Sequence, residues 1–437
     1  MSTWPWWRLF PARKTLRRGV LPGLVGLLLL RAATTASASD WPAFRGPHGD
    51  GLSEAKGVPL NWSDTENVRW KAPLPRPGNG SAIVMKDRVF VTSAEDAAGH
   101  ERSLLCYRLT DGTLDWKRTI HVDKELPTHK TNLYCGTTPA ANDQAVVVWH
   151  ATGGLHAYDH AGNPLWSRDL GEFRHIWGYG SSPILDGGRV ILHSGPGTRV
   201  FLAAFDLKTG KTIWETPEPV EGDGSNTPDR RYFGSWATPL LAEIGGTKQL
   251  VVAMPTRVCG YDPADGRLLW WCDGLRHGGG DLAYSSPLLV GKTCVMTGGF
   301  NGPAIAFPLG GSGDLTSSRL WRTEKNPQSI GSGIVAGDHI IRPNAGPGTL
   351  ECLDPQTGKI VWTARGPGGN MWASIVEAEG RAYATAQNGT TVVFRPDPKG
   401  YEELARNRLD DSTNATPAVT DGTLVFRMDH ALICVGR

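Results

Sequence analysis

The chain has 437 residues, and its 45 Lys and Arg nearly balance its 43 Asp and Glu. Six of the basic residues and none of the acidic ones lie in residues 1–38, so the remainder has a net charge of about −4, which excludes a protein that binds nucleic acid through a basic surface. The 55 Gly and 31 Pro are spread over turn positions, which indicates an all-β protein with many turns and excludes one long disordered tract.

Residues 1–38 have the three parts of a secretory signal peptide. Basic residues between Arg8 and Arg18 precede an apolar stretch over Gly19–Leu30, and Ala36-Ser37-Ala38 has the small residues of a cleavage site. The apolar stretch is too short to cross a bilayer core of ~30 Å as a helix. We therefore predict an exported protein, periplasmic or secreted, with no transmembrane segment after cleavage. An uncleaved membrane anchor is the alternative.

Residues 39–66 are rich in turn-forming residues and show no strand pattern. We predict an irregular segment that packs on the following domain through Trp41, Phe44 and Trp62, with Trp41 as an exposed ring. Asn67–Ala72 then has the pattern of a β-strand that carries Trp70, although no other strands of its own unit come before it.

From Gly80 to the end, one pattern recurs about every 47 residues, which is enough for four strands of ~5–6 residues with their turns. A typical copy starts with Ser182-Pro183 and ends on a strand that carries Trp214. Between these points the strands are nearly continuous apolar runs, which suit sheets that are covered on both faces. A mostly small residue recurs shortly before the last turn of each copy, at Cys106, Ala157, Ala204, Gly260, Ala306, Cys352, Val393 and Cys434.

The repeat predicts an all-β fold over residues 67–437, an eight-bladed β-propeller of four-stranded antiparallel blades. The last copy, Asn414–Gly436, lacks its final strand, so we expect the N-terminal strand Asn67–Ala72 to complete it and close the ring. Seven blades would result if Trp372–Arg408, which lacks the recurring Trp, were an insertion. The blades should start near Gly80, Gly136, Gly180, Ser235, Tyr284, Ser332, Trp372 and Asn414.

The seven cysteines of an exported chain raise the question of disulfides. Cys106, Cys352 and Cys434 occupy the recurring small position and are interpreted as packed thiols. No Cys-x-x-Cys pair with a following His appears, so we predict no metal site. The pairing of the others stays open, namely Cys135, Cys259, Cys272 and Cys294.

The stretch Ala204–Trp214 reads A-F-D-L-K-T-G-K-T-I-W and resembles the tryptophan-docking motif A-x-D-x-x-T-G-x-x-x-W of pyrroloquinoline quinone (PQQ) repeats. Cys352–Trp362 and Gly260–Trp270 match it apart from one and two positions. The opening Trp41–Pro47 and the run Asn326–Gly333 resemble an exported bacterial branch of PQQ-like propellers. The resemblance covers essentially the whole chain after residue 38.

The resemblance implies a structural role for the recurring tryptophans, which dock between neighbouring blades in this family. The PQQ dehydrogenases of the family hold the quinone near the axis between a Trp and two adjacent, disulfide-bonded Cys, with a Ca²⁺ ion beside it. No two Cys are adjacent here, so we expect no cofactor, although PQQ with Ca²⁺ is what a dehydrogenase of this fold would use. The docking residues would be Trp70, Trp116, Trp166, Trp214, Trp270, Trp321 and Trp362.

Residues just before the blade starts should face the axial mouth, where aromatic rings and amides can stack a flat ligand or a sugar. The alternative for the aromatic residues is that their rings only fill the central channel. The alternative for the basic residues is that they only keep a surface loop in contact with water. No catalytic set can be assembled from the sequence. The candidate binding residues are Tyr134, Tyr179, Trp236, Tyr284, Trp372 and Asn414, with Arg174 and His175 beside them.

These observations favour an exported, monomeric and non-catalytic propeller that acts as a binding or interaction scaffold. Its partner would be a protein or a small ligand on a loop face. A periplasmic PQQ-dependent oxidoreductase is one alternative. A scaffold that resembles the outer-membrane assembly propeller lipoprotein is another, and the absence of a Cys after the apolar stretch counts against it.

Overall fold

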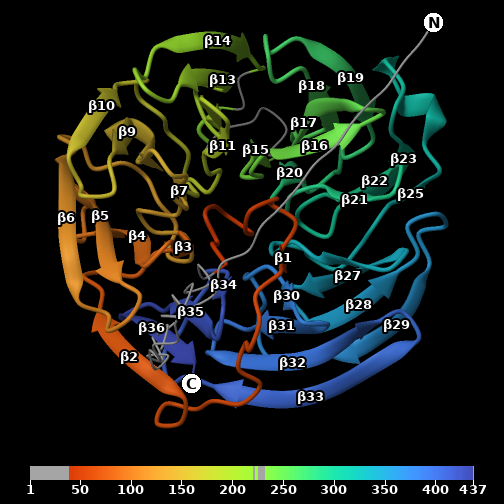
Figure 1. Cartoon of the computed structure of the whole chain (residues 1–437). Helices are drawn as coiled ribbons and strands as arrows, with labels where there is room; N and C mark the ends of the chain where they lie inside the picture. Colours follow the sequence, from red (N-terminus) through yellow and green to blue (C-terminus); the bar gives the residue numbers. More distant parts are fainter. Residues whose placement is uncertain (1–38, 220–221, 225–231, 437) are drawn as a thin grey trace, which may run out of the picture. The chain divides into compact units, whose positions relative to one another are not determined.

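The computed structural model describes residues 39–219, 222–224 and 232–436. The predicted signal peptide lies outside the described residues. Eight antiparallel sheets stand around a central axis as the blades of a β-propeller, so the predicted fold and blade count are confirmed (Figure 1). Within the described residues, no helix is long and apolar enough to span a membrane.

The first four blades follow one another along the chain, and in each blade the first strand lies nearest the axis (Figure 1). Their strands are β3 (Ile83–Met85), β4 (Arg88–Ala94), β5 (Glu101–Arg108) and β6 (Leu114–His121); β7 (Ala140–Ala141), β8 (Val146–Trp149), β9 (Leu155–Tyr158) and β10 (Pro164–Arg168); β11 (Ile184–Asp186), β12 (Arg189–His193), β13 (Phe201–Asp206) and β14 (Thr212–Pro217); and β16 (Leu240–Ile244), β17 (Thr247–Ala253), β18 (Arg257–Tyr261) and β19 (Leu268–Asp273).

The other four blades complete the ring. Their strands are β21 (Leu288–Val290), β22 (Thr293–Thr297), β23 (Ala304–Pro308) and β25 (Trp321–Thr323); β26 (Ile334–Ala336), β27 (His339–Asn344), β28 (Thr349–Leu353) and β29 (Ile360–Arg365); β30 (Val376–Ala378), β31 (Arg381–Thr385), β32 (Thr390–Asp397) and β33 (Gly400–Arg408); and β34 (Ala418–Thr420), β35 (Thr423–Arg427), β36 (Ala431–Gly436) and β2 (Val68–Pro73).

A few short elements are added to this plan. Two strands extend blades in parallel, β1 (Leu52–Ser53) beside β30 and β24 (Gly313–Asp314) beside β19. A separate parallel pair is formed by β15 (Tyr232–Ser235) and β20 (Gly280–Ala283). The two short 3₁₀ helices among the described residues are η1 (Ala151–Gly153) and η2 (Thr316–Ser318).

The ring is closed by the N-terminal strand. β2 pairs antiparallel with β36, the last strand of the chain, with Trp70 opposite Cys434 and Ala72 opposite Leu432. The predicted closure is therefore confirmed, and the edge that β36 would otherwise expose is covered.

The blades pack on one another through both faces of each sheet. In β4, six of the seven residues are buried, because alternate side chains face different neighbouring blades. Between the first two blades, for example, Ile83 and Phe90 belong to the same apolar cluster as Val146 and Val148. This explains why the strands read as continuous apolar runs rather than as an alternating pattern.

The recurring small residue lies directly opposite the recurring Trp in the outer two strands of a blade. Ala204 faces Trp214, and Cys106 faces Trp116. An added Cβ on Gly260 would come within 2.1 Å of the Trp270 ring, so bulk at this position is limited by the indole above it. In the blade that lacks the Trp, Val393 lies opposite Ala405. Because Ala is much smaller than Trp, this blade has room for Val at the recurring small position.

Most of the tryptophans bridge to the next blade as the resemblance implied. The indole N–H of Trp214 donates to the Pro263 carbonyl at 3.1 Å, in the outer turn of the following blade. Equivalent bonds to the next blade's turn join Trp70 to Leu109, Trp116 to His160, Trp166 to Leu207, Trp321 to Pro355 and Trp362 to Asp397.

Trp270 differs from the expected docking geometry. Its indole N–H donates to the side chain of Gln249 in its own blade at 2.7 Å. The reason is local, because Gly260 has no side chain and the indole occupies the space that a Cβ would fill there. The ring still packs against Phe307 of the next blade, with centroids 5.6 Å apart.

Residues 39–66 pass across the ring and bind to several blades, among them the last one, where the Lys56 carbonyl accepts the backbone N–H of Gly422. The Trp41 backbone pairs with Val84, and Ala141 donates its N–H to the Pro42 carbonyl. On the opposite blades, Glu377 donates to the Gly51 carbonyl, and the Arg45 side chain donates to the Gly333 carbonyl. Figure 1 shows this red segment over the middle of the ring.

Two of the three predicted anchors of this segment, Trp41 and Trp62, are 1% and 3% exposed. The expectation that Trp41 is an exposed ring is therefore wrong. Its indole covers Gly46, whose positive φ of 83° lets the chain turn back against it.

In the described part of the chain, the Ser or Thr at each blade start forms a hydrogen bond with the Ser or Thr at the start of a neighbouring blade. Ser81 donates its backbone N–H to the Thr138 hydroxyl of the next blade at 2.9 Å, and Thr138 donates to Ser182 in the same way. The pattern continues from Ser182 to Thr238, Ser286 to Ser332, Ser332 to Ser374, Ser374 to Thr416 and Thr416 back to Ser81. At the remaining junction, the Ser286 hydroxyl donates to the Thr238 carbonyl. We call this closed set the hydroxyl ring.

Candidate functional site: an axial cavity

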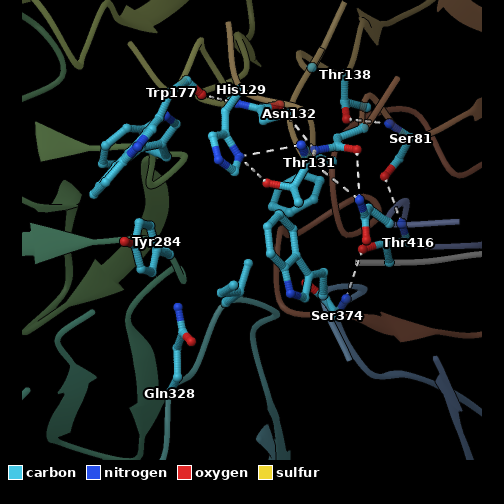
Figure 2. A pocket seen from close by; sticks show the side chains of 18 of the residues that line it. Ser81, His129, Thr131, Asn132, Thr138, Trp177, Tyr284, Gln328, Ser374 and Thr416 are labelled. Atoms are coloured by element: carbon cyan, nitrogen blue, oxygen red, sulfur yellow. Dashed lines mark hydrogen bonds between the residues drawn. The ribbon is translucent and has the colours of Figure 1, made fainter. Parts of the chain in front are cut away.

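A cavity of about 450 Å³ lies on the propeller axis beside the hydroxyl ring. Ser81, Thr138, Ser374 and Thr416 of that ring line one side of it (Figure 2). Phe44 of the N-terminal segment also lines it. The N-terminal segment pairs with Val84, which lies in the innermost strand of its blade, shortly after Ser81 of the hydroxyl ring. Phe44 therefore reaches the cavity from the side of the hydroxyl ring on which the N-terminal segment lies.

Aromatic rings form one wall of the cavity. Trp177 contacts Trp236 with ring centroids 5.9 Å apart, and Trp236 contacts Tyr284 at 5.4 Å. Phe300 meets the Trp177 ring edge-on at 5.3 Å and lines the same wall. Trp372 adds a partly exposed ring to the lining. Together these rings offer flat apolar faces of the kind that stack ring-shaped ligands.

A chain of side-chain amides runs around another part of the lining. Asn414 donates to the Asn79 amide oxygen at 3.1 Å, and Asn79 donates to that of Asn132 at 3.0 Å. Asn132 in turn donates to the backbone carbonyls of Trp177 and Tyr179. Because these amides bind one another, they link blades that are far apart in sequence and stiffen the cavity.

Other polar groups in the lining are free to meet a ligand. The side chain of Gln328 forms no hydrogen bond with the described part of the chain and faces the cavity in Figure 2. The Tyr284 hydroxyl points away from the other lining side chains in Figure 2, so this residue offers the cavity its ring. Nδ1 of His129 accepts hydrogen bonds from the backbone N–H and the hydroxyl of Thr131, which leaves Nε2 available as a donor. None of the described lining residues is Asp, Glu, Lys or Arg.

Half of the predicted binding residues come together here. Trp236, Tyr284, Trp372 and Asn414 line the cavity, together with Asn79. The structure corrects the placement of the others. Tyr134 and Tyr179 turn outward between blades and line a second, smaller cavity. Arg174 is exposed and lies 3.7 Å from Asp223, and His175 is buried behind the aromatic wall.

Sequence reasoning missed several lining residues. His129, Thr131 and Asn132 come from the long loop between β6 and β7, and no repeat marks their positions. Phe300 lies in a Gly-rich turn inside a blade, with a positive φ of 48° that aims it at the axis. Of these missed residues, only Trp177 could have been found from the sequence, because it is an aromatic residue shortly before a blade start, like the residues that were predicted.

His175 supports the aromatic wall from behind. Its Nδ1 accepts the backbone N–H of Trp177 at 3.1 Å, so Nε2 carries the proton and donates to the Phe233 carbonyl at 3.3 Å. The edge of its ring meets Trp236 at 4.9 Å. Burial lowers the pKa of His175 to about 4.

We expect the free energy of unfolding to fall as the pH drops from 6.5 towards 4. His175 stays neutral in the folded chain, whereas in the unfolded chain it takes up a proton near pH 6.5, so its stabilising effect is complete above that pH. One such group contributes a slope of about 1.4 kcal/mol per pH unit. Urea unfolding at several pH values should show a shallower slope for His175→Asn, and the same slope as the unmodified chain for the exposed control His48→Gln. An undiminished slope in His175→Asn would contradict this role.

The cysteines form no disulfides. All seven cysteines are free and buried, including the four whose pairing the sequence left open. Among the described residues, no group of three or more His, Cys, Asp or Glu is placed to hold a metal ion.

The comparisons with known proteins agree on the fold. A family model described as outer membrane protein assembly factor BamB matches residues 100–364. BamB from Moraxella catarrhalis is 14% identical, with 84% of this chain and 98% of that chain covered and a TM-score of 0.57. Quinohemoprotein alcohol dehydrogenase from Comamonas testosteroni is 13% identical, with 93% and 82% covered and a TM-score of 0.62. No curated protein matches the sequence. At such identities, the structures share the fold and nothing more is implied.

Proposed function

Because the chain belongs to the family of PQQ-like β-propellers that the matching family model represents, we propose that it is an exported, non-catalytic binding protein. Its ligand is an uncharged ring compound with hydroxyl or amide groups, such as a sugar, bound in the axial cavity. The family uses one fold for enzymes and for assembly factors alike, so the proposal rests on the site rather than on the fold.

The observation that carries the proposal is the composition of the cavity lining. A volume of about 450 Å³ falls within the ~300–1,000 Å³ typical of small-molecule sites. Aromatic faces at Trp177 and Trp372 favour the apolar face of a ring, while Gln328 and His129 offer hydrogen bonds to its polar groups. A charged ligand would lose its hydration without meeting an opposite charge among the described lining residues.

The same lining does not fit PQQ with Ca²⁺. Calcium takes six to eight oxygen ligands, usually with carboxylates among them, and none of the described lining residues is Asp or Glu. The quinone carries three carboxylates, and none of these residues is Lys or Arg. The arrangement therefore speaks against the oxidoreductase alternative.

Binding is tested by calorimetry with glucose, N-acetylglucosamine and their disaccharides, and with glucuronate and PQQ plus Ca²⁺ as charged probes. We expect heat only with neutral sugars. Gln328→Ala should weaken binding about tenfold, since it removes a hydrogen bond. Trp372→Ala should weaken it at least as much. Gln356→Ala changes the same residue type on an outer turn and should leave affinity unchanged.

Trp236 is a poor test residue although it lines the cavity. It is 9% exposed, and its indole N–H donates to the Gly178 carbonyl at 3.0 Å, so its removal would also disturb the fold. Stoichiometric binding of PQQ with Ca²⁺, and none of neutral sugars, would overturn the proposal and favour the oxidoreductase.

The description of the matching family model favours a second candidate, an assembly scaffold that holds a protein partner on its loop face. Tyr232 is exposed on that face beside Trp177 and is a suitable site for a photo-cross-linking residue. Reproducible cross-links in cells to an outer-membrane protein would favour this candidate. Their absence, with sugar binding intact, would favour the first.

A further inference from the structure

A second, small cavity of about 20 Å³ lies beneath the loop that joins the first two blades. Tyr134 and Cys135 of that loop line it, together with Arg102 from β5 and Trp149 from β8. Its volume suffices for a single water molecule or an ion of similar size.

Four residues that line this cavity each have a buried polar side-chain atom without a hydrogen-bond partner in the described chain. Two of them, Arg102 Nη2 and Trp149 Nε1, belong to groups that can only donate. By contrast, Tyr134 and Thr137 in the same lining donate their hydroxyls to the carbonyls of Leu126 and Trp149. The four unpartnered atoms are Arg102 Nη2, Trp149 Nε1, His150 Nδ1 and Tyr179 OH.

The charge of Arg102 has no counterpart in the cavity. The side chain is 4% exposed, and its other N–H groups donate to the carbonyls of Gly99 and His150 at 2.9 and 2.7 Å. Its guanidinium carbon lies 4.8 Å from the centre of the Tyr134 ring. None of the described lining residues is Asp or Glu. Burial lowers the pKa of Arg102, and Asp96, which lies outside the lining, offsets only part of this effect. A buried guanidinium without an anion in contact is strongly unfavourable.

The other ionisable groups that line the cavity are neutral. Burial raises the pKa of the Cys135 thiol to about 11 and also raises that of Tyr179, so neither supplies a negative charge at neutral pH. Burial, followed by the effect of His156 and Arg102, lowers the pKa of His150 well below its ordinary value. The cavity therefore carries one positive charge.

We propose that this cavity binds a single halide ion, chloride under natural conditions. A halide accepts hydrogen bonds from all directions and neutralises the guanidinium. A water molecule accepts only two hydrogen bonds and leaves the charge uncompensated. Larger anions such as sulfate do not fit the volume.

The ion would hold in place the loop that supplies His129, Thr131 and Asn132 to the axial cavity. Gly136 lines both cavities, and Asn132 donates to the carbonyl of Tyr179, a residue that lines the smaller one. This structural effect is independent of whether the axial cavity binds a sugar.

The test is thermal unfolding of the purified chain in sodium gluconate, with chloride or bromide added at constant ionic strength. The melting temperature should rise with halide concentration as expected for binding to the folded state. Crystals grown in bromide should show an anomalous peak within hydrogen-bond distance of Arg102 Nη2 and Trp149 Nε1.

Conservative variants separate this site from a general salt effect. Trp149→Phe and Tyr179→Phe each remove one donor and keep an aromatic ring, and each should weaken the apparent halide affinity about tenfold. Trp62→Phe is the matched control, because its buried indole N–H is also unpartnered but lies outside this cavity. A halide response that is absent, or equal in all three variants, would overturn the proposal, as would crystals without the bromide peak.

Discussion

Deleting residues 67–72 is expected to abolish the stable closed ring and to prevent soluble expression or lower the melting temperature sharply. These residues form most of β2, the outer strand of the last blade, and Trp70 is 8% exposed there. Its indole N–H donates to the Leu109 carbonyl of the first blade at 2.8 Å, so the strand also ties the two ends of the ring together. Without it, β36 becomes an exposed edge and the apolar cluster beneath loses Trp70 and Ala72.

Circular dichroism melting and size-exclusion chromatography measure this effect. A synthetic peptide of residues 67–73 should restore part of the lost stability by pairing with β36. The same peptide with its order scrambled should not. A melting curve that is unchanged by the deletion would show that the last blade does not need β2.

Trp214→Ala is expected to lower the free energy of unfolding by ~3–5 kcal/mol, as other large-to-small changes in a core do. The indole is 8% exposed and belongs to an apolar cluster with Ile191 and Leu250. Its removal also leaves the Pro263 carbonyl without its donor, which adds to the loss from the cavity.

Trp41→Ala is expected to cost a similar amount, because Trp41 is 1% exposed and fills the space above Gly46. Leu165→Ala is the control, since Leu165 lies next to Trp166 on an outer strand but is 46% exposed. Urea unfolding should show large losses for both tryptophans and a change within about 0.5 kcal/mol for the leucine. Small losses at both tryptophans would contradict their packing roles.

The sequence alone determined the architecture because each blade is a local unit that repeats. The small residues and the tryptophans recur at fixed places in the repeat, and the structure shows that they lie opposite each other, as in the pairs Ala204–Trp214 and Cys434–Trp70. The unmatched strand at residues 67–72 and the incomplete last repeat together predicted the closure. Such features depend only on contacts within a blade or between adjacent blades, so a period in the sequence records them.

Which side chains line the axial cavity was decided by the tertiary structure. Whether Tyr134 faces the axis or the gap between blades depends on the long loop that carries it, and the repeat does not describe that loop. Trp41 is buried because the N-terminal segment crosses the closed ring, which exists only after all eight blades have assembled. The aromatic wall likewise combines Trp177 with Phe300, which lie more than two blades apart in sequence. These contacts form between segments with no common period, so only the closed ring brings them together.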